Sequence, residues 1–233
     1  MNQTILKFLV YGNRVYKSTI GRVIGEKQYR IPTDLSIEQF LRKLEQQGIN
    51  YVVLRWFEDL PSIEPGGDLD LLVADSDYKK LLSLLSYSRS GIGCDVYTQS
   101  VNGGGLYKNL TAYFSPALAQ AILNSKTTLK NYISIPDKAN YFHSLAYHAI
   151  YQKGLKSGLP TSIEGLSPLG RPAHDFRVIL KQLAEAASIA CDISMEALDE
   201  YLGSKGYRPS EETLSKLAKH NLWIQKRFFK EAQ

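Results

Sequence analysis

The clearest alternation of apolar and polar positions lies between residues 33 and 48, which read TDLSIEQFLRKLEQQG. Apolar residues recur there at spacings of three and four, which is typical of an amphipathic helix. Ser36 followed by Gln39 forms a capping box at the first turn, and Gly48 provides a natural end. The pattern therefore predicts a helix within residues 33–48.

Short runs with strand character follow this helix. β-branched, aromatic and leucine-rich stretches predict strands at 50–57 (NYVVLRWF), 68–74 (DLDLLVA) and 94–99 (CDVYTQ), and 106–114 (LYKNLTAYF) is a fourth candidate. Residues 58–67 are rich in Pro and Gly and predict a loop. Between the second and third strands, Asp75 or Ser76 caps a predicted helix at 77–88.

From Ser115 onward the apolar residues return to helical spacing. Helices are predicted within 116–125, 137–154, 173–190, 195–206 and 212–229, with a Gly-, Ser- and Pro-rich loop at 157–172. The predicted fold class is therefore α+β. A small mixed β-sheet with flanking helices occupies residues 33–114, a helical domain occupies 115–233, and a helical or extended segment occupies 1–32.

The N-terminal segment needs separate treatment because its apolar residues between 5 and 24 could line an amphipathic helix. Lys7 interrupts the apolar run and no small-residue cleavage site follows, so a signal peptide is not predicted. Docking of this helix on the core is the plainer interpretation. Attachment to a membrane surface stays open as the alternative.

Composition narrows the class of protein only slightly. The chain has 233 residues, of which 44% are hydrophobic and 22% charged, so a sizeable core needs no disulfides. Its two cysteines lack metal-site spacing and fit a reducing compartment, which predicts a cytoplasmic, possible membrane-peripheral, location. The net charge of +5 suits a phosphate-bearing partner, an anionic membrane surface or neither.

The candidate chemistry lies in the acidic residues of the second and third predicted strands. Asp68 and Asp70 should project from one face of their strand, because side chains alternate along a strand. Asp95 would reach the same space if its strand were a neighbour. Three converging carboxylates repel one another without a cation, and hard oxygen ligands select Mg²⁺ or Mn²⁺. An acidic turn without such a role is the plain alternative.

The motifs GGDLDLLV and CDVYT in this order make the chain resemble the nucleotidyltransferase superfamily, which has the DNA polymerase beta-like fold. The resemblance implies transfer of a nucleotidyl group from an NTP to a hydroxyl on a small molecule, a sugar or glycan, or a protein. It implies Mg²⁺ or Mn²⁺ as cofactor, with Asp68, Asp70 and Asp95 as metal ligands and catalytic residues. Similar chains near bacterial surface-polysaccharide genes suggest a role in polysaccharide biosynthesis.

The substrate contacts that we expect come from both halves of the chain. Gly66 and Gly67 precede the first aspartate, and Arg55 lies near the end of the first predicted strand. His148 and Lys153 lie toward the end of the long predicted helix at 137–154. In polymerase beta-like enzymes the helical domain often supplies such a basic residue. The alternative is a core helix with hydrogen-bonded rim residues.

One departure from the superfamily pattern defines the rival hypotheses. Where the superfamily has a Gly-Ser turn, this chain has Arg55 and Trp56, and Arg55 could bind a phosphate or pair with an aspartate. The first rival is therefore a catalytically degenerate binding or regulatory module with the same fold. The second rival is a basic nucleic-acid-binding protein, and nucleic acid is the partner class that the sequence favours least. The oligomeric state is not predicted.

Overall fold

The computed structural model describes residues 27–229, except for 65, 171 and 173. The predicted amphipathic helix at 5–24, and with it the membrane-surface alternative, lies outside the described residues. Within them, no helix is both long enough and apolar enough to cross a membrane.

The centre of the structure is a mixed sheet of five strands in the order β2-β3-β5-β1-β4. Only β3 and β5 run parallel, and the other neighbouring pairs are antiparallel. The predicted small mixed sheet is thus confirmed. Its strands are β1 (Gln28–Arg30), β2 (Tyr51–Val53), β3 (Asp68–Val73), β4 (Ser86–Ser88) and β5 (Gly93–Thr98).

Helices flank this sheet and make up most of the second half of the described chain, so the fold is mixed α+β. They are α2 (Ile37–Gln46), α3 (Tyr78–Leu82), α4 (Pro116–Asn124), α5 (Lys138–Tyr147), α6 (Phe176–Ala186), α7 (Met195–Ser204), α8 (Glu211–Ala218) and α9 (Leu222–Phe228). A π-helical segment, His148–Lys153, continues α5. The predicted capping box of Ser36 and Gln39 begins α2.

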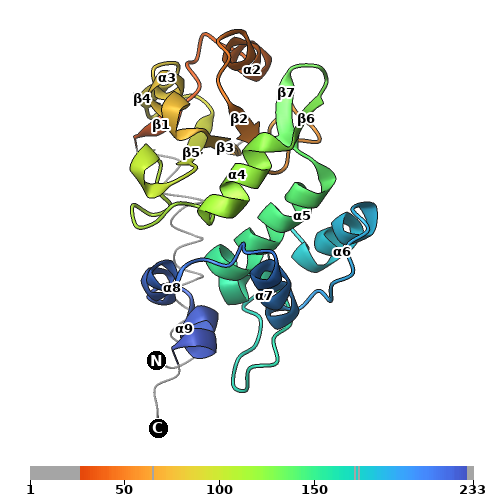
Figure 1. Cartoon of the computed structure of the whole chain (residues 1–233). Coiled ribbons are helices and arrows are strands. Elements are labelled where there is room, and N and C mark those ends of the chain that lie inside the picture. The colour runs from red at the N-terminus through yellow and green to blue at the C-terminus, as the bar shows by residue number, and fades with distance from the viewer. Residues whose placement is uncertain (1–26, 65, 171, 173, 230–233) are drawn as a thin grey trace.

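In Figure 1 the sheet lies at the top with α2 and α3, and α4 and α5 cross the middle, between the sheet and the last helices. Two core clusters cover opposite faces of the sheet. Leu71 and Val73 pack in the cluster that contains residues of α2, whereas Val52 and Leu72 pack in the cluster that contains residues of α4 and α5. Because side chains alternate, Asp70 shares the face of Leu72 and is directed toward the helical half.

The strand β2 is shorter than predicted, and this shortening shapes the site. The Leu54 N–H still donates to the Asp70 carbonyl at 2.9 Å, which extends the pairing by one residue. The chain then leaves the sheet, and Trp56 has a φ of 55°. Arg55 and Trp56 therefore lie in a turn at the end of the strand rather than inside it.

The predicted strand at 106–114 is wrong. Tyr107 and Thr111 form an isolated bridge that closes a turn, and Lys108 and Asn109 between them have positive φ. Such backbone angles are incompatible with a continuous strand. The turn brings Tyr113 and Phe114 into the core beside α4.

Three other elements differ from the predictions because tertiary contacts override local pattern. Residues 86–88, predicted as helix, pair with β1 as β4. A hairpin of β6 (Lys126–Leu129) and β7 (Ile133–Pro136) lies in a region for which no element was predicted. The predicted single helix at 212–229 is divided into α8 and α9 at Asn221, whose side chain accepts from the N–H groups of Trp223 and Ile224.

Candidate functional site

The parallel pairing of β3 with β5 brings the predicted acidic residues onto neighbouring strands. Asp70 lies directly opposite Asp95, and Asp68 lies opposite Gly93. Asp70 is 6% exposed, whereas Asp68 and Asp95 are both exposed to solvent. The Tyr97 hydroxyl donates to Asp95 at 3.2 Å. The site therefore has one buried carboxylate and two at the surface.

The glycine opposite Asp68 leaves room for a further polar side chain. A Cβ at Gly93 would lie 3.3 Å from the Asp68 Cβ and would overlap the amide of Gln28 on β1. The Gln28 side chain thus lies over β5 beside Asp68. Nothing in the local sequence around Gln28 indicates this position, because β1 was not predicted.

Arg55 is bound to the buried aspartate and not to the two exposed ones. Its Nη2 lies 2.6 Å from the Asp70 Oδ1, and its Nη1 donates to the Tyr113 hydroxyl at 2.7 Å. The Arg55 side chain is only 10% exposed. Arg55 therefore acts as the counter-ion of Asp70, which is one of the two roles that the sequence left open.

A chain of hydrogen bonds continues from Arg55 into the helical half. The Gln152 Nε2 donates to the Tyr113 carbonyl at 2.6 Å, and this contact turns the Gln152 oxygen toward His148. The His148 Nδ1 lies 2.8 Å from that oxygen and 2.6 Å from the Tyr113 hydroxyl. Since the amide oxygen can only accept, the His148 proton is placed on Nδ1, and Nε2 keeps its lone pair.

Burial dominates the electrostatics of this network. It lowers the pKa of His148 well below its usual value, and the charges of Arg55 and Lys153 act in the same direction, so His148 is neutral. Burial raises the pKa of Asp70 to about 7; Arg55 opposes this shift, whereas Asp68 and Asp95 add to it. Two neighbouring carboxylates thus favour protonation of the buried one.

Asp68 lies at the rim of the site, where its residue is exposed but its carboxyl group is partly enclosed. This enclosure raises the pKa of Asp68, and the negative charge of Asp95 raises it further. The positive charges of Arg55 and Lys153 act in the opposite direction. Asp68 and Asp95 therefore form a pair of mutually repelling carboxylates that lacks a direct contact with Arg55.

The remaining predicted substrate residues divide into two groups. Lys153 ends the π-helical segment, and its charge acts on Asp68, Asp70 and His148, so it belongs to the same region. Gly66 and Gly67 instead form the turn before β3: Gly66 has a φ of 86°, and the Gly67 N–H donates to the Glu64 carbonyl at 2.9 Å. Their contacts in the structure are those of a turn.

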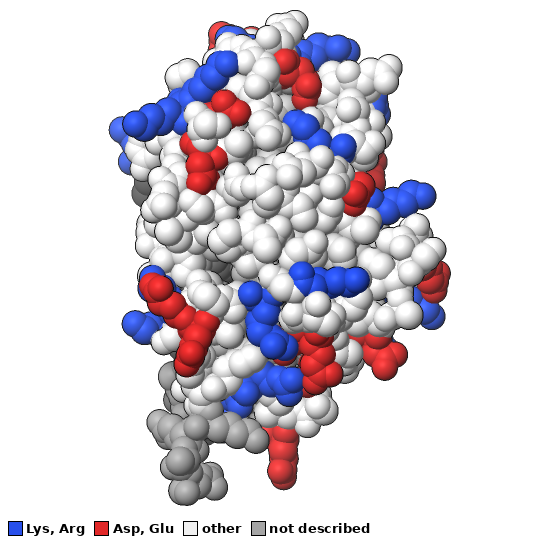
Figure 2. All heavy atoms as spheres, viewed as in Figure 1, with Lys and Arg blue, Asp and Glu red and all other residues white. Residues whose placement is uncertain are grey.

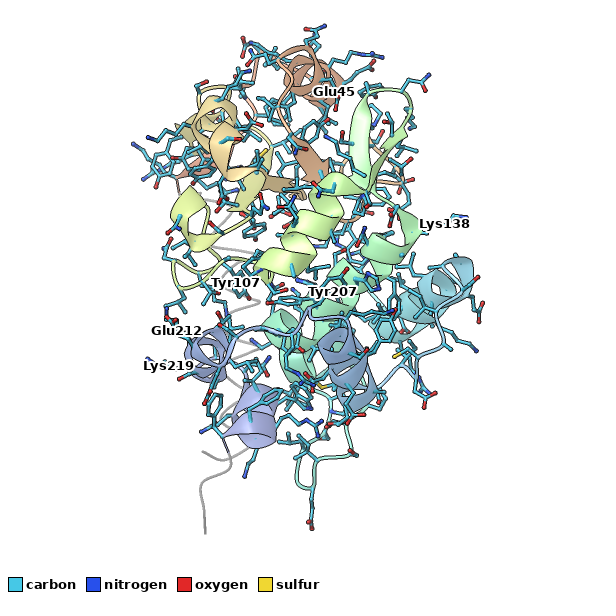
Figure 3. The ribbon with its side chains drawn as sticks, viewed as in Figure 1. Glu45, Tyr107, Lys138, Tyr207, Glu212 and Lys219 are labelled. Atoms are coloured by element: carbon cyan, nitrogen blue, oxygen red, sulfur yellow. The ribbon has the colours of Figure 1, made fainter. Side chains whose placement is uncertain are left out.

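Aromatic rings surround the polar cluster. The rings of Tyr97 and Tyr113 lie 3.9 Å apart, and Tyr107 contacts Tyr113 edge-on at 5.4 Å. Figure 3 shows Tyr107 in the loop that joins β5 to α4, beneath the sheet. The residue after Arg55 is Trp56, whose ring stacks on His174 at 3.7 Å.

A metal centre that uses all three aspartates does not fit this arrangement. Among the described residues, no group of three or more His, Cys, Asp or Glu side chains is arranged to hold a metal ion. The physical reason is that Asp70 is buried and ion-paired with Arg55. The carboxylates that remain are the exposed Asp68 and Asp95, and a divalent cation held by two carboxylates needs further oxygens from a ligand or water.

Several residues of the site were missed by sequence reasoning: Gln28, Tyr97, Tyr113, Gln152 and His174. All but Tyr97 depend on a contact across more than twenty residues or on an element that was not predicted. Tyr97 lies on a predicted strand, but its ring contact with Tyr113 comes from the turn that was predicted as a strand. For Tyr113 the misleading signal was a strand-like run that actually folds as a turn.

In comparisons with protein-family models, with curated proteins and with solved structures, no match to this chain was found.

Proposed function

We propose that this chain is a polymerase beta-like nucleotidyltransferase that binds an NTP together with one divalent cation and passes the nucleotidyl group to a hydroxyl acceptor. The observation that carries the proposal is the pair of exposed carboxylates, Asp68 and Asp95, on adjacent parallel strands. Mg²⁺ is commonly held by one or two carboxylates plus the phosphates of the substrate.

The charges of the site support a need for the cation. Three aspartates face two basic residues, Arg55 and Lys153, so the cluster carries an excess of negative charge when all the groups are ionised. A phosphate-bearing ligand would be repelled by that excess. One divalent cation on Asp68 and Asp95 reverses the sign of the net charge of the cluster, so the site then attracts phosphates.

The roles that this proposal gives to the chain's own residues are limited and specific. Asp68 and Asp95 would hold the cation, which supplies charge neutralisation for the phosphate oxygens. Arg55 keeps Asp70 in place, and Lys153 would face the phosphates. In the transfer, the acceptor hydroxyl oxygen bonds to the α-phosphorus, pyrophosphate leaves, and Asp95 is the candidate to take the hydroxyl proton.

Binding without transfer is the second candidate, and one observation favours it specifically. The ion pair of Arg55 with Asp70, at 2.6 Å, occupies a carboxylate that the superfamily pattern would assign to metal. A module of this kind would still bind a cation and a nucleotide but would release the nucleotide unchanged.

The test combines calorimetry with a transfer assay. Each NTP is titrated into the protein with Mg²⁺ or Mn²⁺, and the same protein is incubated with α-labelled NTP and mixed saccharides while pyrophosphate is measured. We expect cation-dependent binding that Asp68→Asn/Asp95→Asn abolishes. The exposed Asp34 gives the matched control, because Asp34→Asn removes a carboxylate outside the site.

The outcomes separate the two candidates. Cation-dependent binding with pyrophosphate release supports the transferase. Binding without release of pyrophosphate supports the module that binds without transfer. If no nucleotide binds in the presence of either cation, or if the double variant binds as well as the wild-type protein, both candidates are rejected.

The charges on one face of the molecule bear on the nucleic-acid-binding alternative. A nucleic-acid-binding surface is expected to carry a continuous patch or stripe of Lys and Arg. Figure 2 shows one face of the molecule, on which basic side chains are interspersed with acidic ones. The face that Figure 2 shows therefore gives no support to nucleic-acid binding.

A further inference from the structure

Trp56 has an unusual backbone conformation next to the candidate site. Its φ of 55° lies in the left-handed region, which a bulky aromatic residue rarely adopts. Such strain persists only where the surrounding structure imposes it, and it is concentrated at binding and catalytic sites. The turn follows Leu54, which is bonded to the Asp70 carbonyl, so Trp56 lies two residues beyond the sheet.

The ring of Trp56 is covered by a single exposed side chain. His174 stacks on it with ring centroids 3.7 Å apart and planes inclined by 17°, and Phe176 contacts it edge-on at 6.3 Å. Among the described residues, the His174 ring makes no hydrogen bond. The stack on Trp56 is the one ring contact of His174 among the described residues, and no hydrogen bond of the His174 ring opposes its replacement by another flat ring.

The stack and the acidic cluster belong to one continuous region. Arg55, bound to Asp70, immediately precedes Trp56, and Phe176 lies 5.8 Å from the ring of His148, which contacts Tyr113. Burial lowers the pKa of His174, and the charges of Lys153 and Arg55 both act on this group. The same two charges act on Asp68 and Asp70.

We propose that Trp56 is the stacking surface for the base of a nucleotide whose phosphates bind through a divalent cation at Asp68 and Asp95, and that His174 covers this surface in the free protein. This inference rests on the proposed function. The nearly parallel stack favours a planar ring over a puckered sugar ring. Stacking of a base on an aromatic side chain contributes to the binding of every base, because each base has a π face.

The test uses the fluorescence of Trp56. The chain has two tryptophans, and Trp223 is fully buried, so the difference between wild-type protein and Trp56→Phe reports on Trp56. The probes are each NTP, inorganic tripolyphosphate and ribose 5-phosphate, all with Mg²⁺, and calorimetry gives the affinities. We expect NTPs to bind at least about tenfold more tightly than tripolyphosphate and to change the Trp56 signal.

Two variants make the assignment specific. Trp56→Leu should lose the NTP preference and leave tripolyphosphate binding unchanged. His174→Ala keeps Trp56 but removes the competing ring, so it should tighten NTP binding severalfold. This variant still tests the inference if Trp56→Leu disturbs the turn. Tyr87→Ala removes an exposed aromatic ring of β4 outside the site and serves as the control.

Failure of this inference is distinguishable from failure of the proposed function. Equal binding of NTPs and tripolyphosphate without a change at Trp56 overturns the stacking role and leaves cation-dependent binding intact. A change at Trp56 with NTP but without cation dependence keeps the stacking role and rejects the cation site. A Trp56 response to free monosaccharides but not to NTPs overturns the inference in favour of a sugar.

Discussion

At the scale of single residues, Arg55 decides the chemistry of the acidic cluster. It brings a positive charge to Asp70 from the end of β2, and Tyr113 holds its other nitrogen. Burial lowers the pKa of Arg55, but the hydrogen bond with Tyr113 and the negative charge of Asp70 outweigh that effect, so the guanidinium stays protonated. Because arginine is not deprotonated in proteins, only a substitution of Arg55 removes its charge from the site.

Replacing Arg55 should therefore convert the cluster into a stronger cation site. Arg55→Met leaves the three carboxylates without the positive charge of this residue. A bound cation is then no longer repelled by a charge a few ångströms away, and that repulsion is worth roughly 1–4 kcal/mol near a protein surface. We expect Mn²⁺ affinity, measured by calorimetry without nucleotide, to rise at least about tenfold. The same change should lower the stability of the metal-free protein by about 3–5 kcal/mol, because Asp70 loses its partner.

The controls for this substitution lie within the chain. Arg55→Met/Asp70→Asn removes both partners and should return Mn²⁺ affinity to near that of the wild-type protein. Arg42→Met removes an exposed arginine of α2 that pairs with Glu38 and should change nothing at the site. An Arg55→Met protein that folds but binds Mn²⁺ no better than the wild-type protein would show that Arg55 does not compete with a cation.

At the scale of elements, the division between α8 and α9 supports the site from a distance. Asn221 is the N-cap of α9, and its Nδ2 donates to the carbonyls of Ile150 at 2.8 Å and of Tyr151 at 3.1 Å. Both carbonyls belong to the π-helical segment that carries His148 and Lys153. A helix cap in one element thus also satisfies backbone groups in another.

Asn221→Ala should lower the free energy of unfolding by more than the loss of an ordinary helix cap does. Loss of the cap itself costs about 1 kcal/mol, and two buried carbonyls then lose a donor, for a total of roughly 2–4 kcal/mol in the free energy of unfolding. Ser210→Ala removes the cap of α8, which bonds only within its own turn, and should cost about 1 kcal/mol. Denaturant unfolding of both variants checks the difference. Equal losses would mean that Asn221 does not stabilise the π-helical segment.

At the scale of the whole molecule, buried neutral histidines link stability to pH. Burial lowers the pKa of His143 to about 4 and that of His148 well below its usual value. The unfolded chain binds protons at these residues below a pH of about 6.5, whereas the folded chain does not. Their contribution to stability is therefore fully present above that pH and is lost as the pH falls toward about 4.

We expect this loss to reach at most about 1.4 kcal/mol per pH unit for each histidine. His143→Gln should remove one such contribution, so the difference in unfolding free energy between the wild-type protein and the variant should shrink as the pH falls from about 7 to about 4.5. Asp70, whose pKa is raised, acts in the opposite direction in both proteins and cancels in that difference. Urea unfolding at several pH values gives the profile, and a difference that is independent of pH would contradict the assignment.

Local pattern was a good guide where an element depends on its own residues. The capping box of α2, the apolar run of β3 and the helices around 116–125 and 195–206 are all formed by local periodicity. Pattern failed where a segment pairs with a distant one. The residues SYS at 86–88 extend because β1 offers them a partner, and the hairpin of β6 and β7 has no strong alternation to reveal it.

The sequence by itself determined that Asp68 and Asp70 share one face of a strand, because alternation along a strand is a property of the backbone. It also placed Asp95 on a later strand. Only the tertiary structure decided which of these carboxylates are available. The parallel pairing set Asp70 against Asp95, and the early end of β2 turned Arg55 onto Asp70 and Trp56 toward His174. Burial and charge pairing depend on contacts between distant residues, and no local pattern encodes them.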